Sequence, residues 1–334
     1  MFSDLLFPVM YGIVIFLAGM KLMEAALSKL AGPILEDALG RATSTPLMGM
    51  LTSSVVTALL QSSTAVTVLA IGMVNAGLLS FGRTLGIILG SNIGTCLTTE
   101  LAGLEIARFA GPLLAVSLTL WAAAVTAGEL PTAGSRLSGA AIALSRPLQF
   151  ISLAAAGFAL VLWGISVMQS IGPALQSSGM FRWFLDRASE SVLWGFAAGA
   201  CLTALLHSSS ATIGMTMGVA SSGALPPHIG IAIVLGANVG TCITAVIASV
   251  GGSISGVFVA WSHVVLNAGG ALLFLPFTGL LLRAAELIGG GPAAQIAHSQ
   301  TIFNIGCSLL ALPFCYLPLW KRVDLRLSRG RRDL

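Results

Sequence analysis

The sequence predicts an all-α integral membrane protein with two inverted-topology repeats, each containing a re-entrant helical hairpin and a broken transmembrane helix. Three observations predict this fold: an apolar composition, a gapless internal repeat, and apolar segments that polar residues interrupt. Of the 334 residues, 56% are hydrophobic and 8% are charged, against roughly 25% charged residues in a soluble domain. We therefore expect a multi-pass protein of the cell inner (plasma) membrane.

Several apolar runs are long enough to cross a bilayer as helices, which takes ~20 residues. The longest are residues 5–30, 106–127, 150–171 and 296–320. The first run resembles a signal peptide, but it lacks a basic start and a small-residue cleavage pattern, so we expect a retained span. The five cysteines lie in apolar segments without a CxxC pair, which favours packing over a disulfide framework or a zinc site.

The basic residues gather at the end of the chain. Six of the 16 Lys and Arg residues follow the last apolar run, from Lys321 to Arg332. The positive-inside tendency predicts that this tail is cytoplasmic. Binding of nucleic acid or anionic lipid is the alternative meaning of a basic tail, and beside a final span we favour the topological one.

An internal repeat divides the chain. With a shift of 146 positions, residues 57–98 align with 203–244 without a gap, and 18 of the 42 positions are identical. T-A-L-L-Q-S-S-T-A faces T-A-L-L-H-S-S-S-A, and G-S-N-I-G-T-C-L-T faces G-A-N-V-G-T-C-I-T. Shared apolar composition does not align Ser, Asn, Gly and Thr in this way, so the chain contains two copies of one structural unit.

The expected organisation follows from this repeat. Repeat 1 covers residues 1–128, with a span, a hairpin at 46–79, a broken span at 84–101 and a further span; a polar linker follows at 129–146. Repeat 2 covers 147–282, with a span, a hairpin at 192–225, a broken span at 228–250 and a further span; a final span at 295–320 and the basic tail at 321–334 complete the chain.

Segment lengths favour the hairpins. Residues 46–60 form about 15 helical residues, roughly 22 Å, which is too short for a ~30 Å hydrocarbon core. Residues 64–79 are equally short, and Q-S-S lies between the two. One long span with a polar patch is the alternative. With the hairpin, each repeat crosses the membrane three times, so repeat 2 enters upside down, a pattern typical of secondary transporters.

The broken spans have a different signal. G-S-N-I-G and G-A-N-V-G combine glycine and asparagine, which favour unwinding. Irregular backbone is tolerated at membrane depth only inside protein or beside a wet cavity. We therefore expect each broken span to unwind at this motif.

The four interruptions predict which ions the protein binds. At each, a half-helix would begin with Ser or Thr as N-cap, and its free N–H groups and positive dipole end would suit an anion. Open carbonyls, the Gln61 amide and threonine hydroxyls would suit a small hard cation. None of the 12 acidic residues falls in these clusters. Because a proton-driven exchanger would be expected to place a carboxylate there, this absence favours sodium.

These features also have structural explanations that involve no ion binding. Ser and Thr in membrane helices often bond only to neighbouring backbone, but two matched copies favour function. His207 is either a proton carrier or a substitute for the glutamine at position 61, and we favour the substitute. Lys21 and Glu24 are spaced to pair on one helix. An enzyme that uses Ser208 with His207 is disfavoured, because adjacent residues point apart and no orienting acid is present.

At these motifs the sequence resembles the type II sodium-dependent phosphate cotransporters and their bacterial relatives. That family has two Q-S-S-S type motifs, each followed by a G-[SA]-N-I-G-T segment, and the resemblance covers about residues 5–320. It implies sodium-coupled symport of inorganic phosphate by alternating access, not an enzyme. It also implies Na+ as the coupling ion and, as partners, phosphate and membrane lipids but no nucleic acid, with a homodimer left open. Many bacterial relatives carry a further soluble domain, and we expect a transport unit alone.

By position, the resemblance implies two sets of ligands. Those for phosphate are Ser62, Ser63, Thr64, Asn92, Thr95, Ser209, Ser210 and Asn238, and those for Na+ are Gln61, Ser208, Thr241 and Thr244. The sequence departs from the family pattern at His207, Thr64, Cys96 and Cys242. A proton- or sodium-coupled transporter of another small anion, sulfate or a dicarboxylate, is therefore the alternative.

Overall fold

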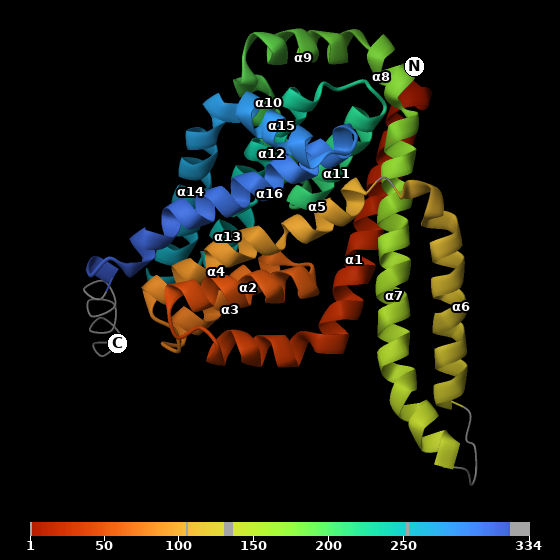
Figure 1. Ribbon diagram of the computed structural model, residues 1–334, viewed down its shortest axis with the longest axis vertical. Helices are drawn as coiled ribbons and strands as arrows, with labels where there is room; N and C mark the ends of the chain where they lie inside the picture. Colours follow the sequence, from red (N-terminus) through yellow and green to blue (C-terminus); the bar gives the residue numbers. More distant parts are fainter. Residues whose placement is uncertain (1, 105, 130–135, 252–253, 321–334) are drawn as a thin grey trace.

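The computed structural model of the protein describes residues 2–104, 106–129, 136–251 and 254–320, and this described part is built of helices (Figure 1). The expected basic tail at 321–334 and residues 130–135 of the expected linker lie outside the described residues. The rest of that linker, from Arg136, is the first part of a long helix.

The helices of the two repeats follow one another in the same order, except that, among the described residues, η1 occurs in the first set alone and α8 and α9 in the second alone. The first set is α1 (Phe2–Arg41), α2 (Pro46–Leu60), α3 (Ser63–Asn75), α4 (Phe81–Gly94), α5 (Cys96–Gly103), the short 3₁₀ helix η1 (Ala107–Phe109) and α6 (Ala110–Glu129). The second set is α7 (Arg136–Ser170), α8 (Gly172–Ser177), α9 (Gly179–Glu190), α10 (Val192–Leu206), α11 (Ser209–Ser221), α12 (Pro227–Gly240), α13 (Cys242–Ser249) and α14 (Ile254–Phe274). The chain continues with η2 (Leu275–Phe277), α15 (Thr278–Ile288), α16 (Pro292–Ala311) and η3 (Leu312–Tyr316).

Six helical segments of the described residues are long and apolar enough to cross a membrane, so the protein is a multi-pass membrane protein. The hairpin helices Pro46–Leu60, Ser63–Asn75 and Val192–Leu206 are apolar but shorter. The expected final span at 295–320 is not among the six. Its helix α16 carries buried polar side chains, among them Gln300, Asn304 and Ser308, and gives way to η3 after Ala311.

The matched helices α1 and α7 cross at two glycine pairs. A Cβ on Gly19 would lie 2.6 Å from the carbonyl oxygen of Gly157, and one on Gly164 would lie 2.8 Å from that of Gly12. Small residues let membrane helices approach this closely. Because the earlier glycine of α1 meets the later glycine of α7, the two helices run antiparallel. Inversion of the two repeats predicts this relation.

The G-S-N-I-G segment does not unwind, contrary to our expectation. Residues 90–94 are helical, and the interruption of the broken span is the single residue Thr95. The glycines serve packing instead: a Cβ would lie 2.1 Å from Pro46 O at Gly86, 1.9 Å from Met50 O at Gly90, and 2.5 Å from Ser54 O at Gly94. Glycine every fourth residue therefore makes a groove along α4 for the backbone of α2.

Repeat 2 uses the same device. A Cβ on Gly236 of α12 would lie 1.9 Å from Phe196 O of α10, and one on Gly240 would lie 2.5 Å from Ala200 O. In both repeats the residues in contact are 40 positions apart. Each hairpin is therefore held through its first arm, which lies along the first half of the broken span.

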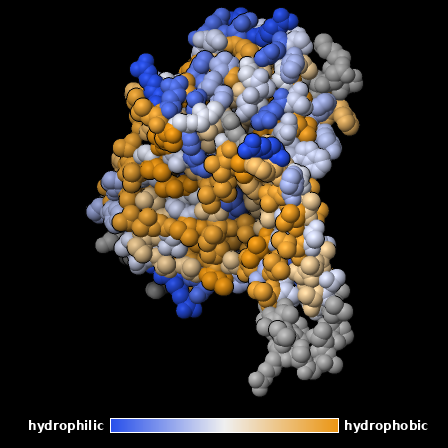
Figure 2. Space-filling model, turned by 45° about the vertical axis from the view of Figure 1, so that its right-hand side comes forward, coloured by the Kyte–Doolittle hydropathy of each residue, from blue (hydrophilic) through white to orange (hydrophobic). Residues whose placement is uncertain are grey.

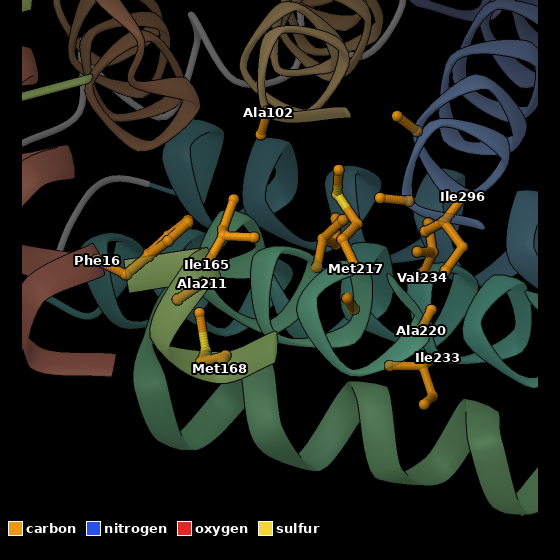
Figure 3. Packing of buried hydrophobic residues seen from close by; sticks show 14 of the residues in the cluster. Phe16, Ala102, Ile165, Met168, Ala211, Met217, Ala220, Ile233, Val234 and Ile296 are labelled. Atoms are coloured by element: carbon orange, nitrogen blue, oxygen red, sulfur yellow. The ribbon is translucent and has the colours of Figure 1, made fainter. Parts of the chain in front are cut away.

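The core joins the two repeats. Figure 3 shows Phe16 of α1, Ile165 and Met168 of α7, Met217 of α11 and Ile296 of α16 packed together. A second cluster packs α2, α3 and α4 of the first repeat against Val259 and Ala260 of α14 in the second. The second arm of each hairpin thus contacts helices of the other repeat, which brings the hairpin tips toward a common region.

Much of the surface is apolar, as a lipid-facing protein requires. Figure 2 shows hydrophobic side chains in a broad area across one face, with hydrophilic ones gathered mainly toward the top. Helix α6, which lies beside α7 in Figure 1, exposes Val116, Leu118, Leu120 and Trp121. Such an area is unfavourable in water and favourable against acyl chains.

Candidate functional site

The two hairpin tips have the same unusual backbone. Gln61 ends α2 with φ 57° and ψ 27°, and His207 ends α10 with φ 51° and ψ 28°. They are the two non-glycine residues with positive φ among those that the structure describes. A non-glycine residue in this left-handed region costs about 1–3 kcal/mol and persists where the surroundings enforce it, often at a functional site.

A serine N-cap starts the second arm of each hairpin, as expected. Ser62 Oγ accepts from Ala65 N at 3.3 Å, and Ser208 Oγ accepts from Ala211 N at 3.2 Å. The N–H groups of the first helical positions, such as Ser63 and Thr64, have no acceptor within their own helix. Together with the positive end of the helix dipole, they make each tip suitable for an anion.

Both tips line one cavity of about 530 Å³. Its polar lining residues are Lys21, Glu24, Gln61, Ser62, Ser63, Thr64, His207, Ser208, Ser209, Ser210, Thr241 and Thr244. Nine of the twelve residues expected to bind phosphate or sodium are therefore brought together, although they are up to 183 positions apart in the sequence. The four expected sodium ligands, Gln61, Ser208, Thr241 and Thr244, are all among them and offer neutral oxygen atoms, which suit Na+.

The interruptions of the broken spans differ from the hairpin tips in how the following helix begins. Thr95 has φ −65° and ψ −21°, Thr241 has φ −59° and ψ −29°, and neither makes a side-chain cap. Their N–H groups stay within the helix, because Thr95 N donates to Ser91 O at 3.3 Å and Thr241 N to Ala237 O at 3.1 Å. A serine side chain therefore caps the second arm at each hairpin tip, whereas no side chain caps α5 or α13.

Three expected phosphate ligands do not line this cavity. Asn92 lines a second cavity of about 350 Å³ and donates through Nδ2 to Asn267 Oδ1 at 3.0 Å. Asn238 is buried and donates to Val234 O at 2.9 Å, and Thr95 Oγ1 donates to Asn92 O at 2.7 Å. Asn92 thus connects α4 to α14, whereas Asn238 and Thr95 bond to nearby backbone, and the sequence does not distinguish these roles from ligand binding.

The two repeats differ in how they support their tips. Thr98 Oγ1 donates to Gln61 Oε1, while Gln61 Nε2 donates to Ala58 O, so both ends of the amide are held. The matching Thr244 of repeat 2 donates instead to Thr241 O at 2.8 Å. Where repeat 2 has His207 in place of Gln61, the threonine at the matching position therefore bonds to backbone and not to the tip residue.

Sequence reasoning missed two charged residues of the cavity. Lys21 and Glu24 form the expected pair, with 2.7 Å between Nζ and Oε2, but they also line the cavity with the hairpin tips. Their signal was present, because a charged residue within an apolar span is a mark of function. The lack of an acidic residue in the four motifs therefore does not favour sodium over the proton, because α1 brings the carboxylate of Glu24 to the cavity.

A second carboxylate lies outside this cavity. Glu100 of α5 contacts His298 Nδ1 at 2.8 Å and accepts from Thr301 Oγ1, both on α16. Its side chain is 28% exposed. The pair ties α16 to the helix that also carries Thr98.

Repeated helical units that bring two interrupted, hydroxyl-rich hairpin tips to one cavity are typical of membrane transporters. The chain belongs to the Na+/Pi-cotransporter family, which matches it twice, over residues 15–170 and again over 160–314. A twofold match agrees with an internal repeat, although the first match extends through α7 to residue 170. The protein is thus a multi-pass plasma-membrane protein of a phosphate transport family, as the resemblance implied.

The chain is also similar to three other proteins. It is 33% identical over 286 residues to the uncharacterized protein YqeW of Bacillus subtilis, covering 86% of this chain and 87% of YqeW. It is 23% identical over 271 residues to the putative inorganic phosphate export protein YjbB of Escherichia coli, covering 81% of this chain and 46% of YjbB. It is 34% identical over 102 residues to the rat sodium-dependent phosphate transport protein 2A, covering 29% of this chain and 16% of the rat protein. No solved structure matches the chain.

Proposed function

We propose that the protein is a sodium-coupled symporter of inorganic phosphate that works by alternating access. The observation that carries the proposal is the single cavity lined by both hairpin tips. Two helix N-termini and the hydroxyls of Ser63, Thr64, Ser209 and Ser210 supply donors from both repeats. Phosphate oxygens are acceptors, so this lining suits a small, highly hydrated anion that must exchange its water for hydrogen bonds.

The cation would be held beside the anion. Ser208 lies in a hairpin tip and Thr241 at the interruption of a broken span, and both line the cavity. A sodium ion bound by these oxygens and by Gln61 would lower the electrostatic cost of bringing phosphate into the cavity. Each ion would then raise the affinity for the other, and this coupling is reciprocal.

The arrangement of the repeats supports alternating access. The cavity has walls from α1, α3, α11 and α13, which belong to both repeats. Relative motion of the repeats would open such a site to one side of the membrane and then to the other. The rat relative is named for sodium-dependent transport and YjbB for phosphate export, so the physiological direction is part of the test.

Labelled phosphate in proteoliposomes tests the proposal. Uptake should be several-fold faster with an inward sodium gradient than with equal sodium concentrations on both sides of the membrane. An outward sodium gradient should drive release of phosphate from vesicles loaded with it. A pH gradient alone should not replace sodium. Equal uptake under both sodium conditions would overturn sodium coupling, and stronger competition by sulfate or succinate than by unlabelled phosphate would overturn the assignment of the anion.

Variants at the tips link transport to the cavity. Ser63→Ala and Ser209→Ala should each lower uptake at least tenfold, because each removes a donor without changing the N-cap. Ser170→Ala on α7 is a control, since its hydroxyl is exposed and donates only to Val167 O at 2.7 Å. Normal uptake by both tip variants would show that the anion binds elsewhere.

A further inference from the structure

An ion pair lies in the cavity with the hairpin tips. Lys21 Nζ and Glu24 Oε2 are 2.7 Å apart on α1, and both residues line the cavity. The Lys21 side chain is 78% exposed and that of Glu24 is 23% exposed. The lysine head therefore has room to move within the cavity, whereas the carboxylate is more enclosed.

The position of this pair is unfavourable unless the pair has a role. Lys21 and Glu24 follow an apolar run from Leu6 to Met20 in helix α1, which is long enough to span the membrane. Ionisable groups at such positions face a wet cavity, pair with one another, and mark the path of ions or substrate. A pair that only stabilised the fold would have no need to face the hydroxyls of both repeats.

The helix that carries the pair is held firmly beside it. A Cβ on Gly157 of α7 would lie 2.6 Å from Gly19 O and 2.6 Å from Met23 N, so the backbone of α1 around Lys21 touches α7 directly. Phe16, one turn earlier, fills the space over Gly214 of α11. Rearrangement is therefore left to the side chains of Lys21 and Glu24, and not to the helix.

An anion that enters the cavity competes with Glu24 for Lys21. Lysine is a flexible point charge that binds phosphate well. When Lys21 turns from Glu24 to the anion, it leaves a carboxylate without its counter-ion in a partly enclosed site, which is unfavourable. A cation at Glu24 removes this penalty, and the nearby hydroxyl oxygens of the cavity lining complete a suitable ligand set for sodium.

We propose that Lys21 and Glu24 exchange partners during binding: Lys21 becomes the counter-ion of the transported phosphate, and Glu24 becomes a ligand of the coupled sodium ion. This proposal rests on the proposed function and adds the device that couples the two ions. Without sodium, Glu24 retains Lys21 and keeps it from the anion. With sodium, Lys21 is released to bind phosphate.

Equilibrium binding of labelled phosphate to the purified protein, in sodium chloride and in choline chloride, tests the exchange. Wild type should bind phosphate at least tenfold more tightly in sodium. Glu24→Gln should bind with similar affinity in both salts, because the amide neither holds Lys21 nor needs sodium. Lys21→Gln should weaken binding at least tenfold in sodium, and Lys21→Arg should restore most of it.

Lys29→Gln is the matched control, because Lys29 is exposed on the same helix two turns further on and does not line the cavity. It should behave as wild type. The sodium-induced rise of the melting temperature without phosphate gives an independent readout and should shrink in Glu24→Gln. Wild-type protein that binds no phosphate would overturn the proposed function together with the exchange. Phosphate binding by wild type, with full sodium dependence in Glu24→Gln or unchanged affinity in Lys21→Gln, would overturn the exchange alone.

Discussion

The substitution Gly90→Ala tests how the hairpin of repeat 1 is held in place. A Cβ at this position would lie 1.9 Å from Met50 O and 2.1 Å from Ser53 Oγ, whereas real Cβ contacts stay beyond 3.0 Å. The difference between 3.0 and 1.9 Å requires α2 and α4 to separate by at least 1.1 Å. Because the nearest atom is a backbone oxygen, no change of side-chain rotamer relieves the overlap.

The expected cost follows from this displacement. Overpacking of this kind typically costs about 1–3 kcal/mol, and the better helix propensity of alanine returns up to about 1 kcal/mol. Because the overlap is with a backbone oxygen only 1.9 Å away, we expect the upper end of this range and a net loss of about 2 kcal/mol. Since α2 ends at the tip residue Gln61, the shift also displaces the site, and a misplacement of about 1 Å can lower a rate roughly 10²-fold.

Thermal unfolding in detergent and phosphate uptake in proteoliposomes measure the two effects. Gly72→Ala is the control, because Gly72 lies in α3 of the same hairpin and a Cβ there would meet nothing within 4 Å. It should be at least as stable as wild type and transport normally. A Gly90→Ala protein as stable and as active as the Gly72→Ala protein would refute the close-packing argument.

Three further predictions concern the tips. Thr98→Val removes the hydroxyl that donates to Gln61 Oε1; we expect a loss of about 1 kcal/mol in stability and a weaker sodium dependence of uptake, and unchanged sodium dependence would argue against Gln61 as a ligand. Ser62→Ala and Ser208→Ala each remove an N-cap and should each cost about 1 kcal/mol in thermal unfolding; Ser62→Ala should raise the KM for phosphate and Ser208→Ala the KM for sodium, and the opposite assignment would exchange their proposed roles. His207→Gln should keep transport with an unchanged pH profile, whereas a shifted profile would identify His207 as a proton carrier.

The sequence by itself determined the class of fold and most of the residues at the site. The composition indicates a membrane protein, because a chain with 8% charged residues would expose too large an apolar surface to water. The repeat of Q-S-S-T as H-S-S-S, 146 positions later, indicated that both motifs act together. Serine before a short apolar segment is also a local signal, and Ser62 and Ser208 are N-caps for that reason.

Only the tertiary structure decided which polar residues meet. Asn92 and Thr95 carry the same sequence signal as Ser63, but their side chains bond to Asn267 and to backbone away from the cavity of the tips. The glycines of G-S-N-I-G read as helix breakers, although their backbone stays helical because glycine is what close contact with α2 requires. Periodicity and propensity are local properties, whereas a close approach depends on the neighbouring helix.

The ion pair of α1 is the clearest example of this difference. The spacing of Lys21 and Glu24 on one helix predicts their contact with each other. It contains no information on what lies beyond the helix surface, because that depends on the glycine contacts of α1 with α7 and on the packing of Phe16 against α11. The sequence determined that two charges pair within an apolar helix; the fold decided that they do so in the cavity where both repeats present their hydroxyls.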